Sequence, residues 1–325
     1  MEVPSEVNRI AWLIKTMRVR GAARIARAAA YAMKVAALSY KGGSLGDYIS
    51  YMKSNASVLT STRPSAVSLH NAVRYVMNRV LRAQSVEEGV KSAVQAADNF
   101  ISMSLSSVKI ISEYGSRLIE DGDTILTHCN SSLALSIIKA AHKGGKKLKV
   151  YATETRPRFQ GLITYNDLIN AGVPTILIPD SAVRYFMKDV DKVIVGADTV
   201  AANGAVVNKV GTSLIALAAH EARVRFYVAA ETYKFSPATV LGELVEIEER
   251  GPEEVLLSNY ISIAKSFKVR NPAFDVTPPE YIDAIITERG ILPPKAASMI
   301  LLEDYGVEIS EELNKITLDV DESLP

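Results

Sequence analysis

Apolar residues recur with helical spacing through the first 120 residues. The stretches "VNRIAWLIKTM" and "AARIARAAAYAMKVAALSY" are rich in Ala, Leu and Met, with apolar positions three or four residues apart. A further helix is expected from Ser65 to Arg82, and Ser85 with Glu88 forms a capping box that opens another. No strand pattern interrupts these segments. The pattern therefore predicts an all-helical N-terminal domain over residues 1–120.

After "EDGD" the pattern changes, because short apolar runs now alternate with amphipathic stretches. The apolar runs are "TILTH", "LKVYATE", "PTILIPD", "KVIVGAD" and "RFYVAAE". Short strands that alternate with helices indicate right-handed βαβ units and a parallel sheet. The predicted fold class is α/β, with a Rossmann-like doubly wound domain over residues 121–325. The proline-punctuated tail "NPAFDVTPPEYIDAIITERGILPP" is expected to wrap back over the sheet.

Composition narrows the class of protein. The chain has 325 residues, of which 48% are hydrophobic and 22% charged, as in ordinary globular proteins. Its 37 Lys and Arg balance 36 Asp and Glu, so no bulk field favours nucleic acid or an anionic membrane. Any anionic ligand must then be bound by local cations. A single cysteine excludes an intramolecular disulfide, and the charged N-terminus resembles neither a signal peptide nor a membrane span. A cytoplasmic protein is expected.

Several chemistries have no sequence signature here. The chain contains no G-x-G-x-x-G at a strand-to-helix turn, no Walker loop, no G-x-S-x-G and no H-E-x-x-H. Its four histidines are scattered without metal-ligand spacing. We therefore expect no cofactor and no catalytic metal.

The carboxyl ends of the predicted strands carry one thiol and four acids, and ligands of open parallel sheets bind at these ends. The residues are Cys129, Glu154, Asp180, Asp198 and Glu231. Acids at strand ends are often helix N-caps, and Asp180 before "SAVRYFM" fits that structural role. Asp198 leaves a long apolar strand, so desolvation is expected to raise its pKa and let it carry a proton. The alternative for Asp198 is a cap or a partner for the turn "ANG".

Cys129, in "ILTHCNSS", has two readings. A lone cysteine is usually a small buried hydrophobic residue. Cys129 nevertheless lies in a strand-to-helix turn, where the N–H groups of "NSSL" point toward it and favour a thiolate. A modest depression of the thiol pKa would make it a proton-transfer base.

Four cations stand in turns marked by glycine or proline: Arg20 in "VRGAA", Arg63 in "STRPS", Lys209 in "NKVG" and Lys234 in "TYKFS". Each of them alone fits a solvated surface charge. Together they indicate a substrate with more than one phosphate, because arginine clamps phosphate in two places and lysine supplies a point charge.

Six segments, in this order, resemble one superfamily: "RGAARIARAAA", "STRPSAVSLHNAV", "ILTHCNSS", "ETRPRFQG", "IVGADTVAANGAVVNKVGT" and "YVAAETYKFSP". That superfamily joins methylthioribose-1-phosphate isomerases, archaeal ribose-1,5-bisphosphate isomerases and the regulatory subunits of translation initiation factor 2B. The resemblance covers nearly the whole chain. It implies Cys129 and Asp198 as the catalytic pair. It also implies a set of substrate-binding residues: Arg20, Gly21, Ala22, Ala23, Arg63, Gln160, Asn208, Lys209 and Lys234.

The resemblance also favours one branch of the superfamily. The regulatory subunits typically lack the thiol–aspartate pair, whereas this chain has both residues. "RGAAR" in place of "RGAPAI", together with Lys234, is similar to the bisphosphate branch. The resemblance thus implies an aldose–ketose isomerase that converts ribose 1,5-bisphosphate to ribulose 1,5-bisphosphate in AMP and nucleoside salvage. Proton transfer through an enolate-type intermediate is expected, with a hydride shift as the alternative.

Two other functions stay open, namely methylthioribose-1-phosphate isomerase and a non-catalytic regulatory subunit. The expected partners are a phosphorylated pentose and further copies of the chain. These copies would form a dimer or an assembly of the hexamer-of-dimers type, with no nucleic acid and no membrane.

Overall fold

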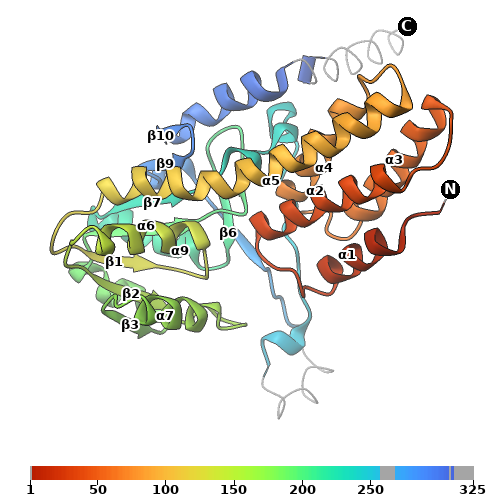
Figure 1. Ribbon diagram of the computed structural model, residues 1–325. Helices are drawn as coiled ribbons and strands as arrows, with labels where there is room; N and C mark the ends of the chain where they lie inside the picture. Colours follow the sequence, from red (N-terminus) through yellow and green to blue (C-terminus); the bar gives the residue numbers. More distant parts are fainter. Residues whose placement is uncertain (1, 257–267, 307–308, 311–325) are drawn as a thin grey trace, which may run out of the picture. The chain divides into compact units, whose positions relative to one another are not determined.

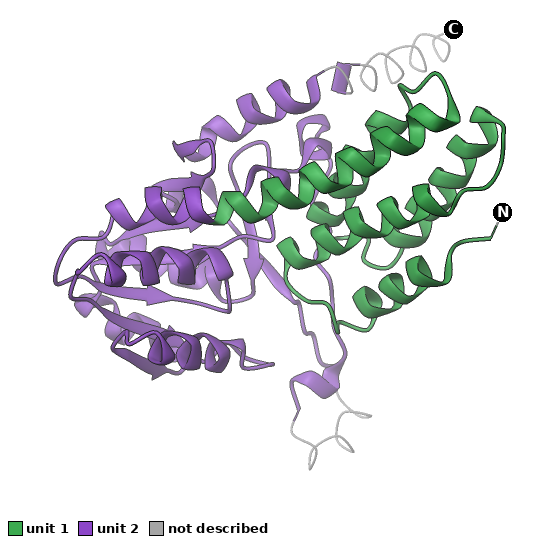
Figure 2. Ribbon diagram, in the orientation of Figure 1, with its two compact units in different colours: residues 1–108 green, residues 109–325 purple. Residues whose placement is uncertain are grey.

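The computed structural model describes residues 2–256, 268–306 and 309–310. The chain divides into two compact units, residues 1–108 and 109–325 (Figure 2). The division falls inside one long helix, α5 (Val86–Arg117), whereas the helical sequence pattern ends near residue 120. Each unit is described by itself below.

Unit 1 is helical, as the spacing of its apolar residues predicted. Its helices are α1 (Ser5–Lys15), α2 (Ala22–Ser39), α3 (Leu45–Thr60), α4 (Val67–Val80) and the first part of α5. The predicted cap at the start of α5 is confirmed for Ser85, because Glu88 N donates to Ser85 Oγ at 3.2 Å, while the Glu88 carboxylate accepts from Gln84 N at 2.8 Å. Gly89 lies against the buried ring of Tyr48, where a Cβ would come within 2.6 Å of the ring. This close approach lets α5 pack directly on α3.

Unit 2 is built on a seven-stranded sheet in the order β10-β9-β7-β4-β1-β2-β3 (Figure 1). The five predicted apolar runs form five consecutive strands of this sheet: β1 (Thr124–Thr127), β2 (Lys149–Thr153), β3 (Thr175–Ile178), β4 (Lys192–Gly196) and β7 (Arg225–Ala229). All neighbouring pairs among these five strands are parallel. The predicted α/β class, with a helical N-terminal part and a doubly wound sheet, is confirmed.

The chain order reverses between β1 and β4, which are neighbours in the sheet. From β1 the chain winds outward through β2 to β3, and after β4 it winds the other way to β7. Open sheets bind their ligands beyond the carboxyl ends of the strands at such a switch point. Cys129 follows β1 and Asp198 follows β4.

Helices cover the sheet because alternate residues of its strands face opposite sides. The helices of this unit are α6 (Ser132–Lys143), α7 (Gln160–Asn170), α8 (Val183–Phe186) and α9 (Thr212–Ala222), followed by helical residues 297–306. Val193 and Val195 of β4 share one buried cluster with Ile215 and Ala219 of α9.

The tail of unit 2 differs from the prediction, because it extends the sheets and does not wrap over them. One part forms β9 (Ala284–Thr287), parallel to β7, and β10 (Gly290–Leu292), antiparallel to β9. Another part forms β8 (Phe274–Thr277), which joins β5 (Thr199–Val200) and β6 (Val206–Lys209) in a second, antiparallel sheet. The prolines read as loop signals stand between these short strands and bound them.

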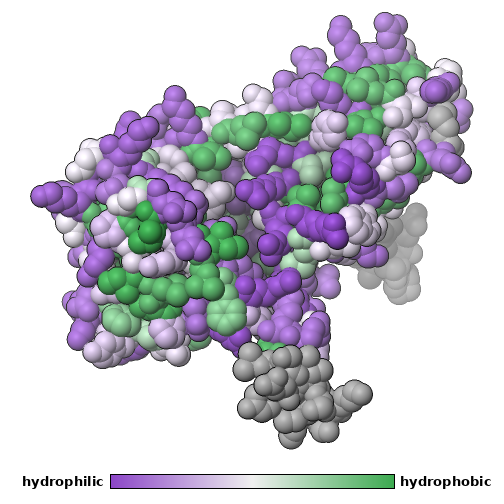
Figure 3. All heavy atoms as spheres, turned by 60° about the horizontal axis from the view of Figure 1, so that its bottom comes forward, coloured by the Kyte–Doolittle hydropathy of each residue, from purple (hydrophilic) through white to green (hydrophobic). Residues whose placement is uncertain are grey.

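Apolar side chains also gather on the surface of unit 2 (Figure 3). Several large ones are exposed on α7 and on the edge strand β3, namely Leu162, Ile163, Ile169, Ile176 and Leu177. Within the described ranges, no helix is both long and apolar enough to cross a membrane.

Candidate active site

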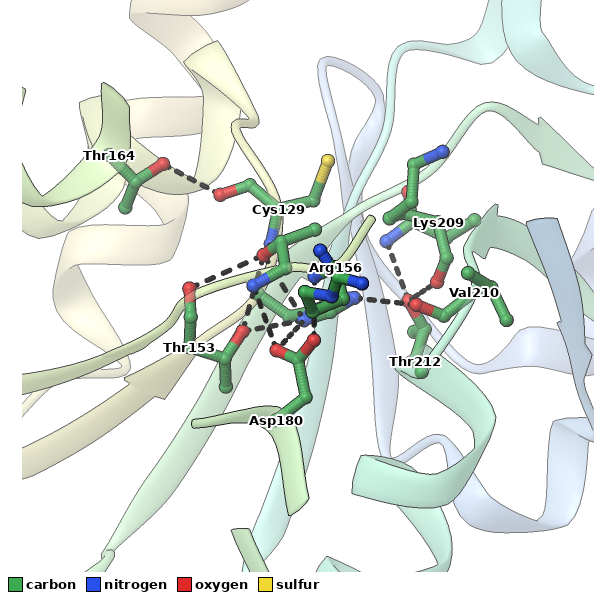
Figure 4. Close-up of polar contacts among 12 residues, drawn as sticks. Cys129, Thr153, Arg156, Thr164, Asp180, Lys209, Val210 and Thr212 are labelled. Atoms are coloured by element: carbon green, nitrogen blue, oxygen red, sulfur yellow. Dashed lines mark hydrogen bonds and ion pairs between the residues drawn. The ribbon is translucent and has the colours of Figure 1, made fainter. Parts of the chain in front are cut away.

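Cys129 lies in the turn between β1 and α6, and hydrogen bonds fix its main chain on both sides (Figure 4). Its N–H donates to Thr155 Oγ1 at 2.9 Å, and its carbonyl accepts from Thr164 Oγ1 at 2.7 Å. The residue has a φ of 64°, in the left-handed region that side chains other than glycine rarely adopt. Such a backbone persists where its surroundings hold it, and it turns the thiol away from the direction of the strand.

Asp198 reaches the same edge of the sheet from the neighbouring strand. Gly196, the last residue of β4, makes this approach possible, because a Cβ there would lie 2.3 Å from Ser131 Oγ. The Cys129 turn therefore packs directly over the end of β4. Asp198 N donates to Val207 O at 2.9 Å, which ties the aspartate to β6. The Asp198 carboxylate is near enough to raise the pKa of Cys129. The structure thus brings together the two residues predicted as a catalytic pair.

The expected depression of the Cys129 pKa is wrong for the protein without substrate. Desolvation by the surrounding protein raises the pKa of the thiol to about 11, and this effect exceeds all the others. The Lys209 ammonium and the Asn130 N–H lower the pKa of Cys129, and their effect is smaller than that of desolvation. A lowering by main-chain N–H groups was expected from the helix N-terminus. Cys129 is therefore a neutral thiol at neutral pH.

Lys209 and Asn208 end strand β6 beside this thiol, and both are buried. Lys209 Nζ donates to Ala273 O at 2.7 Å and lies 4.8 Å from the centre of the Phe274 ring. Burial lowers the pKa of Lys209, while the nearby Cys129 raises it. Asn208 Nδ2 donates to Thr212 Oγ1 at 3.0 Å. With 5% of Lys209 exposed, the surface-charge reading of this residue is wrong.

Lys234 is also buried, and it forms an ion pair with Glu231 at 2.8 Å. It ends a short 3₁₀ turn (Thr232–Lys234) that follows β7. Burial raises the pKa of Glu231, but the Lys234 charge and hydrogen bonds outweigh it, so the pKa lies below its usual value. Phe235 bridges Val200 of β5, two residues beyond Asp198. Lys234 therefore belongs to the same end of the sheet as the catalytic pair.

Gln160 is the first residue of α7, close to the Cys129 turn. Thr164, one helical turn further along α7, contacts both Cys129 and Asn130. Residues four apart share one face of a helix, so Gln160 and Thr164 lie on the side of α7 that faces this turn. The Gln160 Oε1 atom is buried and, among the described residues, has no hydrogen-bond partner. Gly161 lets α7 start this close to β2, because a Cβ there would lie 1.7 Å from Thr153 O.

The remaining predicted residues belong to unit 1, where they gather at one end of the helical bundle. Arg20 and Gly21 form the turn before α2, and Gly21 has a φ of 87°. Ala22 and Ala23 open α2, while Arg63 lies in the turn before α4. Ser68, at the start of α4, donates from Oγ to Ala22 O at 3.0 Å, so the two helix N-termini are adjacent. Two N-termini and two arginines make this end favourable for an anion.

Two carboxylates, those of Asp180 and Asp275, accept main-chain N–H hydrogen bonds that the sequence did not predict. The predicted role of Asp180 as the cap of its own helix is wrong. Its carboxylate instead accepts from Thr155 N at 2.8 Å and from Arg156 N at 2.7 Å. Asp275 accepts from Gly211 N at 2.7 Å, and from Ser213 N, at the start of α9. Burial raises the pKa of Asp275 to about 6.

Two basic residues were also missed. The charge of Arg250 lowers the pKa of Cys129, and its side chain is 10% exposed and bonded to Glu248 at 2.9 Å. The run "EIEERGPEE" is rich in acidic residues, so its composition does not indicate that Arg250 belongs to the site. His128, next to Cys129, is buried, and no metal-ligand spacing had drawn attention to it. Across the described residues, no three or more His, Cys, Asp or Glu side chains form a group that could hold a metal ion.

The fold and these motifs define the class of the protein: the chain belongs to the Initiation factor 2 subunit family, which matches residues 18–294. Ribose 1,5-bisphosphate isomerase of Archaeoglobus fulgidus is 52% identical over 314 residues, which cover 97% of this chain and 98% of that protein. The protein of the same name from Thermococcus kodakarensis is 50% identical over 311 residues, covering 94% and 97%. A crystal structure described as the Pyrococcus horikoshii translation initiation factor eIF-2B has a TM-score of 0.78 at 33% identity, covering 90% of this chain and 98% of that one.

Proposed function

We propose that the protein is an aldose–ketose isomerase that converts ribose 1,5-bisphosphate to ribulose 1,5-bisphosphate. The observation that carries the proposal is the pair of Cys129 and Asp198 at the ends of two adjacent strands, with Lys209 beside them. A thiol and a carboxyl group within electrostatic reach of each other can move two protons in one site. Relatives of about half-identical sequence that carry this activity in their names support the same substrate.

The phosphates of the substrate require cations, which the proposal assigns as follows. Lys209 and Lys234 supply positive charge at the sheet end, and the N-terminus of α6 adds main-chain N–H groups. Gln160 contributes its buried carbonyl oxygen to the same site. For the end of unit 1 that carries Arg20 to Ala23 and Arg63, where the N-termini of α2 and α4 are adjacent, we propose phosphate binding within that unit.

The acid and the base form in one internal step. Because the Cys129 pKa is near 11 without substrate, the thiol must lose its proton when the substrate binds. Transfer of that proton to the Asp198 carboxylate creates a thiolate and a carboxylic acid together. Lys209 and Arg250, which both lower the Cys129 pKa, stabilise the thiolate that results.

In the reaction, Asp198 first donates and later regains a proton, and Cys129 first removes and later returns one. Asp198 donates its proton to the ring oxygen, and the C1–ring oxygen bond breaks while the C1 phosphate stays attached. The Cys129 thiolate removes the proton from C2, so the C2–H bonding pair becomes the C1–C2 double bond of an enol phosphate. The enol hydroxyl returns a proton to Asp198 as the C2 ketone forms, and Cys129 reprotonates C1. Both residues end in the state in which they started the cycle.

The cellular setting of this reaction is also a proposal. The product suits a nucleotide-salvage route, and we propose a cytoplasmic enzyme that assembles as at least a dimer. The exposed apolar side chains of α7 and β3 support assembly, because monomeric proteins rarely leave such a group uncovered. Light scattering after size exclusion measures the assembly directly, and a mass of one chain, 35.3 kDa, would contradict it.

Parallel assays on one preparation test the function. Ribose 1,5-bisphosphate and methylthioribose 1-phosphate are supplied separately, and the ketose product of each is measured. The proposal expects turnover of the bisphosphate; turnover of the methylthio sugar alone would assign the protein to the sister reaction. Inactivity on both sugars, with co-purification of initiation factor 2, would favour a regulatory subunit. In heavy water, deuterium at C1 would support proton transfer, because the Cys129 thiol can exchange its proton with solvent before it reprotonates C1, whereas a hydride shift brings no solvent deuterium to C1.

A further inference from the structure

His128 is buried between the end of β2 and the residues that follow β6, and both of its ring nitrogens form hydrogen bonds. Its Nε2 is 2.9 Å from Val210 O, and its Nδ1 is 2.6 Å from Thr153 Oγ1. A carbonyl oxygen only accepts, so Nε2 carries the hydrogen and donates it. Burial lowers the His128 pKa, which keeps the ring neutral. Nδ1 is then an acceptor, and the Thr153 hydroxyl donates to it.

On one side, this ring is connected to the Cys129 turn. Thr153 Oγ1 lies 3.3 Å from Thr155 Oγ1, which in turn accepts from the Cys129 N–H. Asp180 holds the main chain of Thr155 through its N–H group (Figure 4). The hydroxyls of Thr153 and Thr155 are therefore fixed on a strand end that does not itself carry the thiol.

On the other side, the ring is connected to the residues that follow β6. Val210, which accepts the Nε2 hydrogen, is the immediate neighbour of Lys209. Gly211 packs on the imidazole, because a Cβ there would lie 3.1 Å from the ring. One buried side chain thus links the turn of the thiol to the strand end of the ammonium group.

We propose that His128 is a positioning residue that holds the strand end of Lys209 at a set distance from the thiol of Cys129. The expected effect of His128 on turnover rests on the proposed function. The expected effect on the distance between Lys209 and Cys129 does not. Without the Nε2 hydrogen, the part-buried Val210 carbonyl loses this donor, and the strand end moves to find another one. The interaction of a charge with a thiolate weakens with distance, so the Lys209 ammonium then lowers the Cys129 pKa less.

Two matched substitutions separate the two ends of the imidazole. In His128→Gln, the longer amide places an N–H donor near the former Nε2 and preserves the bond to Val210. In His128→Asn, the shorter amide reaches only the Nδ1 position and leaves Val210 unpaired. His220→Asn is the control, because that exposed ring stacks on Tyr281 at the far end of α9. Thr153→Val is a second variant of near-equal shape, which removes the donor to Nδ1 together with the contact to Thr155 Oγ1.

The first readout requires no substrate. Cys129 is the only cysteine of the chain, so the rate of thiol alkylation as a function of pH reports its pKa alone. We expect His128→Asn to raise that pKa by about one unit, which is roughly tenfold slower alkylation at a fixed pH below it. His128→Gln and His220→Asn should follow the parent curve, and Thr153→Val should shift in the same direction as His128→Asn by less.

The second readout is turnover of ribose 1,5-bisphosphate. His128→Asn should lower kcat by roughly tenfold or more with little change in KM, and His128→Gln should restore most of that loss. Equal losses in the Asn and Gln variants with unchanged alkylation curves would overturn the proposal and make His128 a packing residue. If the parent does not turn the sugar over, the alkylation curves still decide the role of His128, so the two failures are distinguishable. Should His128→Asn not fold, an unshifted alkylation curve for Thr153→Val would overturn the proposal.

Discussion

Lys234 Nζ and Glu231 Oε2 lie 2.8 Å apart, and their side chains are 7% and 0% exposed. Each charge therefore depends on the other for its solvation. Removing one partner of a buried pair costs about 3–5 kcal/mol, whereas replacing both with apolar groups of similar size is often nearly neutral. This relationship separates two functions of Lys234, one in stability and one in substrate binding.

We expect Lys234→Met and Glu231→Gln each to lower the free energy of unfolding by a few kcal/mol. The double variant should be more stable than the sum of the two losses predicts, which urea unfolding measures. With ribose 1,5-bisphosphate, Lys234→Met should raise KM by roughly tenfold or more, because a phosphate contact is lost. An unchanged KM in a folded Lys234→Met variant would remove Lys234 from the substrate site.

The Cys129 thiol is expected to titrate near pH 11 in the protein without substrate. Alkylation of this single cysteine should therefore accelerate steeply only above pH 9, with the same protein in denaturant as the reference for an ordinary thiol. Cys129→Ser supplies the background rate. A curve with its midpoint below pH 8 would instead support the thiolate predicted from the helix N-terminus.

Asp275 should make stability depend on pH. Its folded-state pKa of about 6 lies above that of an ordinary aspartate, so the unfolded chain loses this proton first. The stability from the protonated group is fully present below about pH 4 and is lost as the pH rises through 6. Asp275→Asn, which cannot ionise, should therefore gain stability relative to the parent between pH 4 and pH 7.

Urea unfolding at several pH values measures this difference. The exposed Asp167, paired with Lys139 on the surface, provides a matched Asp→Asn control that should show little slope. A difference between Asp275→Asn and the parent that does not vary with pH would contradict the raised pKa of Asp275.

Gly196 should be required for the approach of the catalytic pair. A methyl group at this position would meet Ser131 Oγ at 2.3 Å and push the Cys129 turn away from the end of β4. Gly196→Ala should thus lower kcat by roughly tenfold or more, with a smaller fall in thermal stability. Gly43→Ala, where a Cβ meets nothing within 4 Å, is the control. Equal kcat values for the parent and Gly196→Ala would show that the turn tolerates displacement.

Much of the fold could be predicted from local patterns. The five strands β1, β2, β3, β4 and β7 are short apolar runs, and their alternation with helices indicates their parallel arrangement. The second sheet could not be predicted in this way, because β5 has two residues and the partner of β6 comes from the distant tail. Short strands of this kind are specified by tertiary pairing and not by their own periodicity.

The site shows the same division. Cys129 and Asp198 were candidates because each follows a strand, a rule that needs no distant contact, and the family resemblance implied them as the catalytic pair. Asp275 and Arg250 were missed because their effects on the site depend on segments far along the chain. The direction of the Cys129 pKa shift was wrong because a local argument counts the helix N-terminus but not the desolvation imposed by the folded core.

The most direct test of the central claim is turnover of ribose 1,5-bisphosphate by the parent protein beside Cys129→Ser and Asp198→Asn. All three proteins are first shown to unfold at similar temperatures, so that a loss of turnover reports chemistry. The account predicts conversion to ribulose 1,5-bisphosphate by the parent and a loss of at least about a hundredfold in kcat in each variant. Turnover that persists in either variant would contradict the assignment of that residue, and no turnover by the parent would contradict the proposed function.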